Sequence, residues 1–310
     1  MKNISMDLIR VTEAAAISAS AWVGSGNKLE ADKAATAYMR SRLEKMPIHG
    51  MVQIGEGKKD ESYGLFKGDE VGQPILPEHS GKDCTLKYPE YDIAVDPIDG
   101  TTPTVNSGPE ATSVIAIAEK GAMFDTEEHY MLKLAVSGHV AKRTNLYLST
   151  PIEVLCQQVA DVLNKPVDKL MVCILNRPRH EQYIQAMRNL GVRIKLIQDC
   201  DISGAIAAVE GNIDMQFGVG GAPEAVLTAA AVKCLGGFFL SQIWKDGELK
   251  GPVMTHDDLV RSHCCFAATG ITDGSLLRGV SWGGNGPKTH SIFMRSESGT
   301  VRWVETRHGN

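Results

Sequence analysis

The heptad Asp96–Thr102, which reads Asp-Pro-Ile-Asp-Gly-Thr-Thr, holds the residues of this chain best suited to chemistry. It follows the apolar run Tyr91–Val95, so we expect a strand to end here in a turn. The proline fixes its own φ and Gly100 lets the backbone approach a ligand closely, which leaves Asp96 and Asp99 little freedom. Hard divalent cations prefer such oxygen ligands. The whole heptad therefore favours metal-assisted phosphate chemistry over an ordinary surface turn.

Carboxylates near the ends of expected elements could together bind more than one divalent ion, namely Asp32, Glu56, Asp96, Asp99 and Glu224. Metals beside a phosphate would neutralise its oxygens, lower the pKa of a bound water and stabilise the leaving alkoxide. Taken singly, Asp32 fits a solvated helix face better than a metal ligand, and the default interpretation of Glu224 is an acid in the first turn of a helix. Glu56, between two glycines, fits a ligand and an ordinary turn equally well.

The hydroxyl groups of Thr101 and Thr102 directly follow Gly100. Either residue could begin a helix whose free N–H groups face a phosphate. A hydroxyl in this place could orient the attacking water or help to deprotonate it. The pattern fits a simple N-cap equally well, so both interpretations stay open at this point.

Positive charge gathers at Arg177, Arg179 and His180, after the strand expected at 169–175 and at the start of a helix. Two guanidinium groups with a proline between them suit a phosphate that lies away from the metals, because arginine donates bidentate hydrogen bonds. A solvated helix start fits the same residues about as well. We interpret His180 as a neighbour of this phosphate or as a surface group, and not as a general base.

Asp199 and Asp201 hold the same position after the next strand, where their carboxylates could accept hydrogen bonds from sugar hydroxyls. Taken alone, they fit an acidic N-cap of the helix expected at 203–210 slightly better. Cys200 between them lacks the His and Asn context of a catalytic nucleophile. Nucleotide binding has no support, because no glycine-rich phosphate-binding motif accompanies these strand–helix units.

The composition of the 310 residues is that of a globular protein, with 43% hydrophobic and 22% charged residues. The formal net charge of −5 and the pI near 6.0 provide no basic field for nucleic acid, which favours a small-molecule partner. The seven cysteines are scattered, which predicts a reducing, cytoplasmic compartment and no disulfide framework. Residues 1–23 fit an amphipathic helix rather than a signal peptide, and no stretch approaches the roughly 18 apolar residues of a membrane span.

Hydrophobic periodicity predicts two regions of different rhythm. The amino-terminal region should hold helices at 4–23 and 29–46, a strand at 50–54 and a long polar loop at 73–90. The later region should alternate helices at 151–164, 179–190, 203–210 and 222–235 with strands at 169–175, 192–197 and 213–217. We expect an α/β fold, a layered α/β/α/β/α sandwich, with an α+β metal-binding domain at 1–145 and an α/β substrate-binding domain at 146–310.

A set of ordered segments carries a resemblance that extends over nearly the whole chain. The segments are Arg10–Ala15, Lys28 with Ala31–Asp32, Ile54–Gly57, Asp92–Thr101, Tyr130–Met131 with Lys133–Leu134, Pro178–His180, Gly220–Glu224 and Ala268–Thr272. Together they resemble the class II fructose-1,6-bisphosphatases, a branch of the lithium-sensitive sugar and inositol phosphatase superfamily. The Asp-Pro-Ile-Asp-Gly-Thr motif alone would indicate only the superfamily.

The resemblance implies hydrolysis of the 1-phosphate of fructose 1,6-bisphosphate to fructose 6-phosphate and phosphate, in gluconeogenesis or sugar-phosphate cycling. The implied cofactor is Mg²⁺ or Mn²⁺, held by Asp32, Glu56, Asp96, Asp99 and Glu224. The implied catalytic residues are Thr101, which assists the attacking water, with Asp99 and Glu56. The implied substrate contacts are Asp99, Gly100, Thr101, Tyr130, Arg177, Arg179, Asp199, Asp201 and Glu224. In this assignment the two arginines bind the 6-phosphate, and Asp199 and Asp201 meet sugar hydroxyls.

The chain departs from the family pattern at three of these places. Arg177 stands where Lys is common, Cys200 where Gly is common, and Asp99 where many bacterial members have Glu. Arg177 and Asp99 carry the same sign of charge as the residues common in the family, so we expect this chain to retain the hydrolysis reaction. The loop at 73–90 is longer than the family pattern and could act as a lid or alter the choice of substrate. The segment Gly236–Phe266 is shorter.

Two other interpretations stay open. The first is a related phosphatase that acts on sedoheptulose 1,7-bisphosphate, alone or with the fructose compound, or on an inositol or nucleotide phosphate. The paired Arg177 and Arg179 favour a substrate with a second phosphate. The second is a sugar-phosphate-binding regulator without activity. In each case we expect a homo-oligomer, a dimer or a tetramer, with no nucleic-acid or membrane partner.

Overall fold

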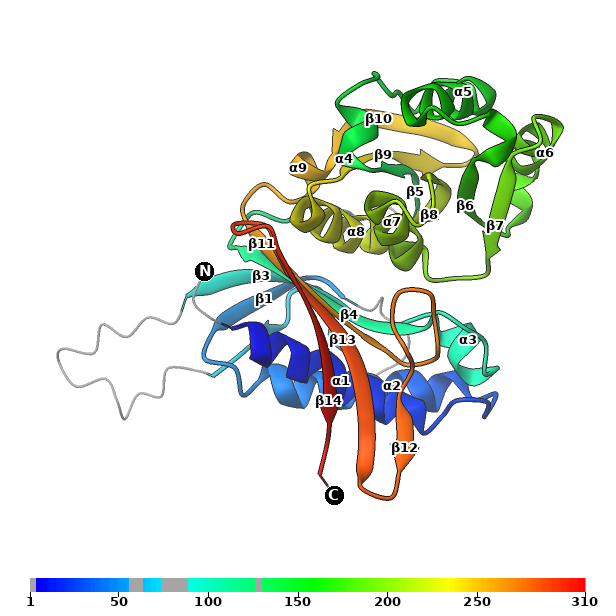
Figure 1. Ribbon diagram of the computed structural model, residues 1–310. Coiled ribbons are helices and arrows are strands. Elements are labelled where there is room, and N and C mark those ends of the chain that lie inside the picture. The colour runs from blue at the N-terminus through cyan, green and yellow to red at the C-terminus, as the bar shows by residue number, and fades with distance from the viewer. Residues whose placement is uncertain (1–3, 56–63, 74–88, 126–129, 310) are drawn as a thin grey trace. The chain divides into compact units, whose positions relative to one another are not determined.

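The computed structural model describes residues 4–55, 64–73, 89–125 and 130–309, and Figure 1 shows their course. Glu56, Cys84 and the loop residues 74–88 lie outside the described residues. Contacts divide the chain into two compact units. The first contains Met1–Asp125, Cys265–Phe293 and Arg302–Asn310, and the second contains Thr126–Cys264 and Met294–Val301. The domains expected at 1–145 and 146–310 stay a prediction.

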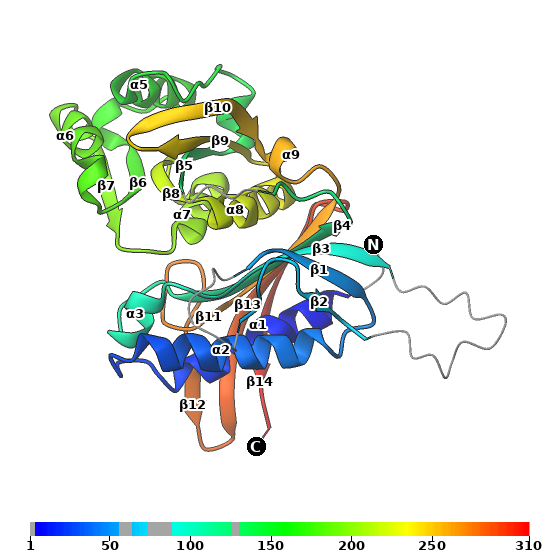
Figure 2. The same cartoon turned by 180° about the vertical axis from the view of Figure 1, so that it is seen from behind.

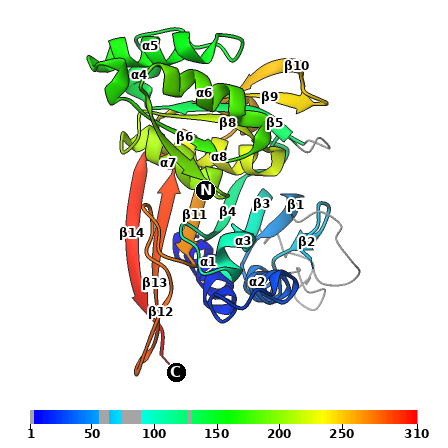
Figure 3. The same ribbon diagram turned by 90° about the vertical axis from the view of Figure 1, so that its right-hand side faces the viewer.

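The first sheet is mixed, with strand order β12-β13-β11-β4-β3-β1-β2 and with β14 paired to β13. Its strands are β1 (His49–Ile54), β2 (Glu70–Val71), β3 (Glu90–Asp99), β4 (Thr112–Glu119), β11 (Cys264–Gly270), β12 (Ser281–Gly283), β13 (Gly286–Arg295) and β14 (Thr300–Arg307). The helices of this part are α1 (Ser5–Ser20), α2 (Lys28–Leu43) and α3 (Thr101–Val105). Figure 3 shows β13 and β14 side by side.

Helices α1 and α2 pack together and cover one face of this sheet (Figure 1). Their apolar sides, with Leu8 and Met39, share one core with alternate residues of the central strands, among them Ile93 and Ile115. Alternation places such residues on one face because successive side chains of a strand point to opposite faces. This packing holds β3 and α2 against each other and so fixes the two elements that carry the heptad and Asp32.

The second sheet has the strand order β10-β9-β5-β8-β6-β7. Its strands are β5 (Tyr130–Val136), β6 (Met171–Leu175), β7 (Arg193–Ile197), β8 (Met215–Gly221), β9 (Phe238–Lys245) and β10 (Glu248–Thr255). The helices are α4 (Gly138–Ala141), α5 (Ile152–Leu163), α6 (Glu181–Asn189), α7 (Asp201–Glu210), α8 (Ala222–Leu235) and α9 (His256–Leu259), with 3₁₀ turns η2 (Val167–Lys169) and η3 (Pro178–His180). Strands β6, β7 and β8 are parallel, so their carboxyl ends share one edge of the sheet.

Helices cover both faces of the second sheet. Figure 2 shows α5 and α6 over one face and α7 and α8 over the other. Leu132 and Leu134 of β5 belong to the core beneath α5 and α6, whereas Lys133 between them pairs with Asp201 of α7. The two mixed sheets with their helices confirm the expected α/β class. In the described part of the chain, no helix is both long and apolar enough to cross a membrane.

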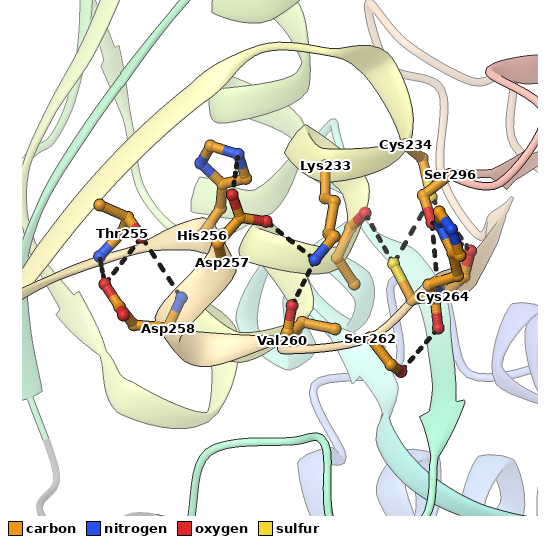
Figure 4. Close-up of polar contacts among 12 residues, drawn as sticks. Lys233, Cys234, Thr255, His256, Asp257, Asp258, Val260, Ser262, Cys264 and Ser296 are labelled. Atoms are coloured by element: carbon orange, nitrogen blue, oxygen red, sulfur yellow. Dashed lines mark hydrogen bonds and ion pairs between the residues drawn. The ribbon is translucent and has the colours of Figure 1, made fainter.

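The carboxyl end of α8 makes polar contacts with α9 and with the start of β11 (Figure 4). Lys233 Nζ donates to Val260 O at 2.6 Å and lies 2.8 Å from Asp257 Oδ1. The Sγ atoms of Cys234 and Cys264 are 3.8 Å apart. These two cysteines are buried free thiols, as are the other four described. These contacts hold the carboxyl end of α8, whose first turn, at the other end, contains Glu224.

Candidate active site

The heptad forms the end of β3 and a sharp turn into α3. Asp96 pairs with Val114 and Asp99 with Thr112, so two residues of β3 oppose a single residue of β4 between these pairs. Such a bulge bends a strand and re-aims its side chains. Asp96 Oδ1 accepts a hydrogen bond from the backbone N–H of Ile98 at 3.0 Å, which fixes its carboxylate within the bulge.

Gly100 makes the turn that follows. Its φ of 102° and ψ of 54° lie in the left-handed region, which a residue without a Cβ adopts at little cost. Its carbonyl accepts hydrogen bonds from the N–H of Thr104 at 3.0 Å and from Thr104 Oγ1 at 2.9 Å. The chain is therefore locked directly after Asp99, whose side chain is buried at 5% exposure.

Helix α2 brings two further side chains to the heptad. Thr101 Oγ1 donates to Asp32 Oδ1 at 2.8 Å, and Lys28 Nζ donates to Thr102 Oγ1 at 2.8 Å. The N-cap of α3 is Gly100, and no side chain caps this helix, so the interpretation of either threonine as a simple N-cap is wrong. Asp32 is half-buried and bonded to the heptad, which also overturns its interpretation as a solvated helix face.

The expected metal ligands of the first unit fit a hard divalent cation in their chemistry. Asp32, Asp96 and Asp99 offer carboxylate oxygens, and a buried carboxylate such as Asp99 favours a nearby positive charge. Within the described ranges, no three side chains of the His, Cys, Asp and Glu types are grouped closely enough to hold a metal, and Glu56 lies outside those ranges. The expected set of five ligands therefore stays a prediction.

In the second unit, the two arginines follow β6 as expected, and each is held by a specific partner. Arg177 Nη2 lies 2.6 Å from Asp199 Oδ1. Arg179 donates from Nε and Nη2 to the carbonyl of Val219 at 3.1 and 2.8 Å, and its guanidinium lies 5.0 Å from the ring centre of Tyr130. Tyr130 itself is 42% exposed. These contacts orient both cations and the exposed ring at the carboxyl edge of the sheet.

His180 is fully buried, so its interpretation as a surface group is wrong. Its Nε2 accepts a hydrogen bond from the N–H of Val219 at 2.8 Å, which leaves Nδ1 to donate to the carbonyl of Leu175 at 2.7 Å. Burial lowers the pKa of this imidazole from its ordinary value of 6.5. The neutral ring thus connects the carboxyl ends of β6 and β8 through its two hydrogen bonds.

We predict that His180→Phe destabilises the chain by about 2–4 kcal/mol, because it leaves two buried backbone groups without a partner. Since burial lowers the pKa of His180, the unfolded chain binds a proton first as the pH falls, and stability is lost below about pH 6.5. The variant should lose this part of the pH dependence. Urea unfolding at pH 7.5 and 5.5 measures both effects, with the exposed His139→Phe as control. Equal unfolding free energies for His180→Phe and wild type at pH 7.5 would contradict the prediction.

Asp199 and Asp201 do not cap α7, contrary to the acidic N-cap interpretation. The helix begins at Asp201 rather than at 203, and its N-cap is Cys200, without a side-chain cap. Cys200 has a φ of 67°, a conformation that costs a non-glycine residue roughly 1 kcal/mol or more. This geometry gives a physical reason for the glycine that the resembled family commonly has here.

Glu224 lies in the first turn of α8, as interpreted from the sequence. Its Oε2 has no accessible surface and no hydrogen-bond partner among the described residues. Burial raises the pKa of this carboxyl, while the charge of Lys133 acts in the opposite direction. A Cβ on Gly221 would lie 1.8 Å from Oε2, so a larger residue there would force the Glu224 carboxylate to move. A buried carboxylate oxygen in this condition fits a cation ligand.

Lys133 is a site residue whose role the sequence reasoning missed. Its ammonium pairs with Asp201 Oδ2 at 2.8 Å, and both side chains are buried. The available signal was a single charge in the apolar strand Tyr130–Val136, because a lysine is almost never fully buried without a partner.

Comparison with known proteins found relatives that match nearly the whole chain. A family model described as "Bacterial fructose-1,6-bisphosphatase, glpX-encoded" matches residues 2–308. The chain is 37% identical to a Microcystis aeruginosa protein named D-fructose 1,6-bisphosphatase class 2/sedoheptulose 1,7-bisphosphatase, over 99% of this chain and 96% of the relative. It is 36% identical to a Synechococcus sp. protein of the same name, over 99% of this chain and 95% of the relative.

Proposed function

We propose a substrate and a role for each site residue of this chain, which belongs to the family of bacterial class II fructose-1,6-bisphosphatases and is a phosphatase. The proposed reaction is hydrolysis of the 1-phosphate of fructose 1,6-bisphosphate to fructose 6-phosphate and phosphate. The observation that carries it is the bulged end of β3, where Asp96, buried Asp99 and the Asp32–Thr101 hydrogen bond lie together. A place in gluconeogenesis or sugar-phosphate cycling follows from this reaction.

The proposed cofactor is Mg²⁺ or Mn²⁺, held by Asp32, Glu56, Asp96, Asp99 and Glu224. When bound, the metal supplies positive charge for the phosphate oxygens and for the attacking water. Thr101 donates its hydroxyl proton to Asp32, so the lone pairs of Thr101 Oγ1 can accept a hydrogen bond from that water and orient it. Gly100 lets the backbone approach the same phosphate, and Glu56 and Asp99 complete the proposed catalytic set.

The proposed subsite for the remainder of the substrate is on the second unit. Arg177 and Arg179 would bind the 6-phosphate, because each is already oriented by a neighbour and arginine matches phosphate geometry. Asp199 and Asp201 would accept hydrogen bonds from sugar hydroxyls, and Tyr130 would pack against the substrate with its exposed ring.

A second candidate substrate is sedoheptulose 1,7-bisphosphate. The relatives from Microcystis aeruginosa and Synechococcus sp. carry both activities in their names. This sugar also has a phosphate at each end, so the pair of arginines suits either compound.

Phosphate release tests the proposal. We expect release from fructose 1,6-bisphosphate with Mn²⁺ or Mg²⁺, loss of release after chelation, and recovery when metal is returned. Sedoheptulose 1,7-bisphosphate and inositol 1-phosphate are assayed in parallel. Metal-dependent release led by the inositol compound would overturn the substrate, and sugar-phosphate binding without any release would favour a regulator.

We also propose that the chain acts in the cytoplasm as a homo-oligomer, a dimer or a tetramer. The scattered cysteines support a reducing compartment. The base rate of symmetric assembly supports the oligomer, which light scattering of the purified protein measures.

A further inference from the structure

Lys133 is the one lysine or arginine that is buried among the residues described for this chain, at 1% exposure. It lies in the middle of β5, between Leu132 and Leu134, whose side chains fill the core on the other face of the sheet. An ammonium group without a partner in such a place would be strongly unfavourable. Its position therefore calls for a reason beyond packing.

The direct ion-pair partner of Lys133 is one carboxylate, that of Asp201, and the charge of Lys133 also acts on Glu224. Nζ donates to Asp201 Oδ2 at 2.8 Å, and the side chain of Asp201 is 6% exposed. On the adjacent strand β8, a Cβ at Gly220 would lie 2.0 Å from Asp201 Oδ2 and 2.9 Å from Lys133 Nζ. The ion pair therefore occupies space that is open only because residue 220 has no Cβ.

We propose that Lys133 is a positioning residue that holds Asp201 Oδ2, so that Asp201 Oδ1 accepts a hydrogen bond from a sugar hydroxyl of the substrate. The assignment rests on the proposed function, because it takes the sugar-binding role of Asp201 from there. Lys133 itself touches neither the substrate nor the reacting phosphate. Its contribution is the orientation of one carboxylate.

The kinetic consequence of this role differs from that of general structural support. Asp201 binds a part of the substrate that does not react. Its correct orientation therefore stabilises the bound substrate and the transition state equally. Removing Lys133 should then raise KM and leave kcat nearly unchanged. Loss of one charge-assisted hydrogen bond corresponds to a rise in KM of about 10- to 100-fold.

Lys133→Met and Gly220→Ala test the proposal by different routes. The first keeps an apolar stem but removes the ammonium, and the second keeps both charges but forces Asp201 Oδ2 to move. Both should show the raised KM for fructose 1,6-bisphosphate with kcat within about threefold of wild type. Gly284→Ala, where a Cβ would meet nothing within 4 Å, should match wild type. An unchanged KM in either folded variant, or a lower kcat at unchanged KM, would overturn the proposal.

The double variant Lys133→Met/Asp201→Asn covers the case in which Lys133→Met does not fold, since it leaves no unpaired buried charge. If Lys133 acts through Asp201, the KM of the double variant should equal that of Asp201→Asn alone. A further rise in KM would count against the proposal. This comparison needs no folded Lys133→Met protein.

Calorimetric binding of fructose 6-phosphate separates failure of this proposal from failure of the proposed function. If wild type releases no phosphate from any bisphosphate, the reaction is wrong, and the binding measurement still decides the role of Lys133. Binding by wild type that is weakened about 10-fold or more in Gly220→Ala supports the positioning role. Equal binding by the two proteins, or no binding by wild type, overturns it.

Discussion

Asp96→Asn is expected to lower kcat for fructose 1,6-bisphosphate about 10³-fold with the fold retained. The amide oxygen of Asn can still accept the hydrogen bond from Ile98 N–H, now 3.0 Å from Oδ1, so the bulge of β3 should survive. The amide lacks the negative charge that a divalent cation needs, and a bound metal contributes several kcal/mol of charge stabilisation. Steady-state kinetics at saturating Mn²⁺ measure the loss of kcat, and urea unfolding measures whether the fold is retained.

Asp92→Asn is the matched control, because Asp92 is a buried carboxylate on the same strand with a structural task. Its Oδ2 accepts from the N–H of Met123 at 3.0 Å, and its Oδ1 accepts from Gln53 Nε2 at 3.3 Å. We expect this variant to lose about 1–2 kcal/mol of stability and little kcat. A kcat of Asp96→Asn within tenfold of wild type would contradict a metal role for Asp96. An equal loss of kcat in Asp96→Asn and Asp92→Asn would contradict it too.

The local part of this architecture follows from sequence patterns. The apolar run before the heptad predicted the strand, and the glycine after Asp99 predicted the turn that the left-handed Gly100 makes. Helical periodicity predicted 4–23 and 222–235, which the structure has as Ser5–Ser20 and Ala222–Leu235. These features depend on neighbours in sequence, so propensity and periodicity are enough to find them.

The ends of elements were predicted less well where a single backbone conformation decides them. Helix α7 was expected at 203 with an acidic cap, but it begins at Asp201 after the left-handed Cys200. Nothing in the residue type of Cys200 indicates a positive φ, which β-carbon-bearing residues rarely adopt. The resemblance held the one clue, because the family commonly has a glycine there.

Partners that are distant in sequence could not be predicted from the chain alone. Thr101 bonds Asp32 from 69 positions away, and Lys133 pairs with Asp201 from 68 positions away. Strand alternation indicates that Lys133 lies on the face opposite Leu134, but which helix covers that face is decided by the tertiary packing. The same holds for His180, whose two hydrogen bonds join strand ends that only the folded sheet brings together.

The double variant Arg177→Met/Arg179→Met is expected to lose about 10³-fold in kcat/KM for fructose 1,6-bisphosphate, and to change little with fructose 1-phosphate. Each guanidinium should contribute about 2 kcal/mol through charge-assisted hydrogen bonds to the 6-phosphate, and both are already oriented, by Asp199 and by the carbonyl of Val219. Methionine keeps the apolar stems but removes the Arg179 guanidinium from above the Tyr130 ring, so the fold of the double variant is checked by urea unfolding.

The control for this pair is Arg193→Met, which removes a cation from the opposite, amino end of β7, where Arg193 donates to the carbonyl of Lys169. Steady-state kinetics with both substrates should leave this control unchanged. The ratio of the two kcat/KM values decides the question, because a folding defect lowers both values together and cancels in the ratio. A ratio equal to that of wild type would mean that the arginines do not bind the phosphate that distinguishes the two substrates, and the 6-phosphate would then need another set of donors.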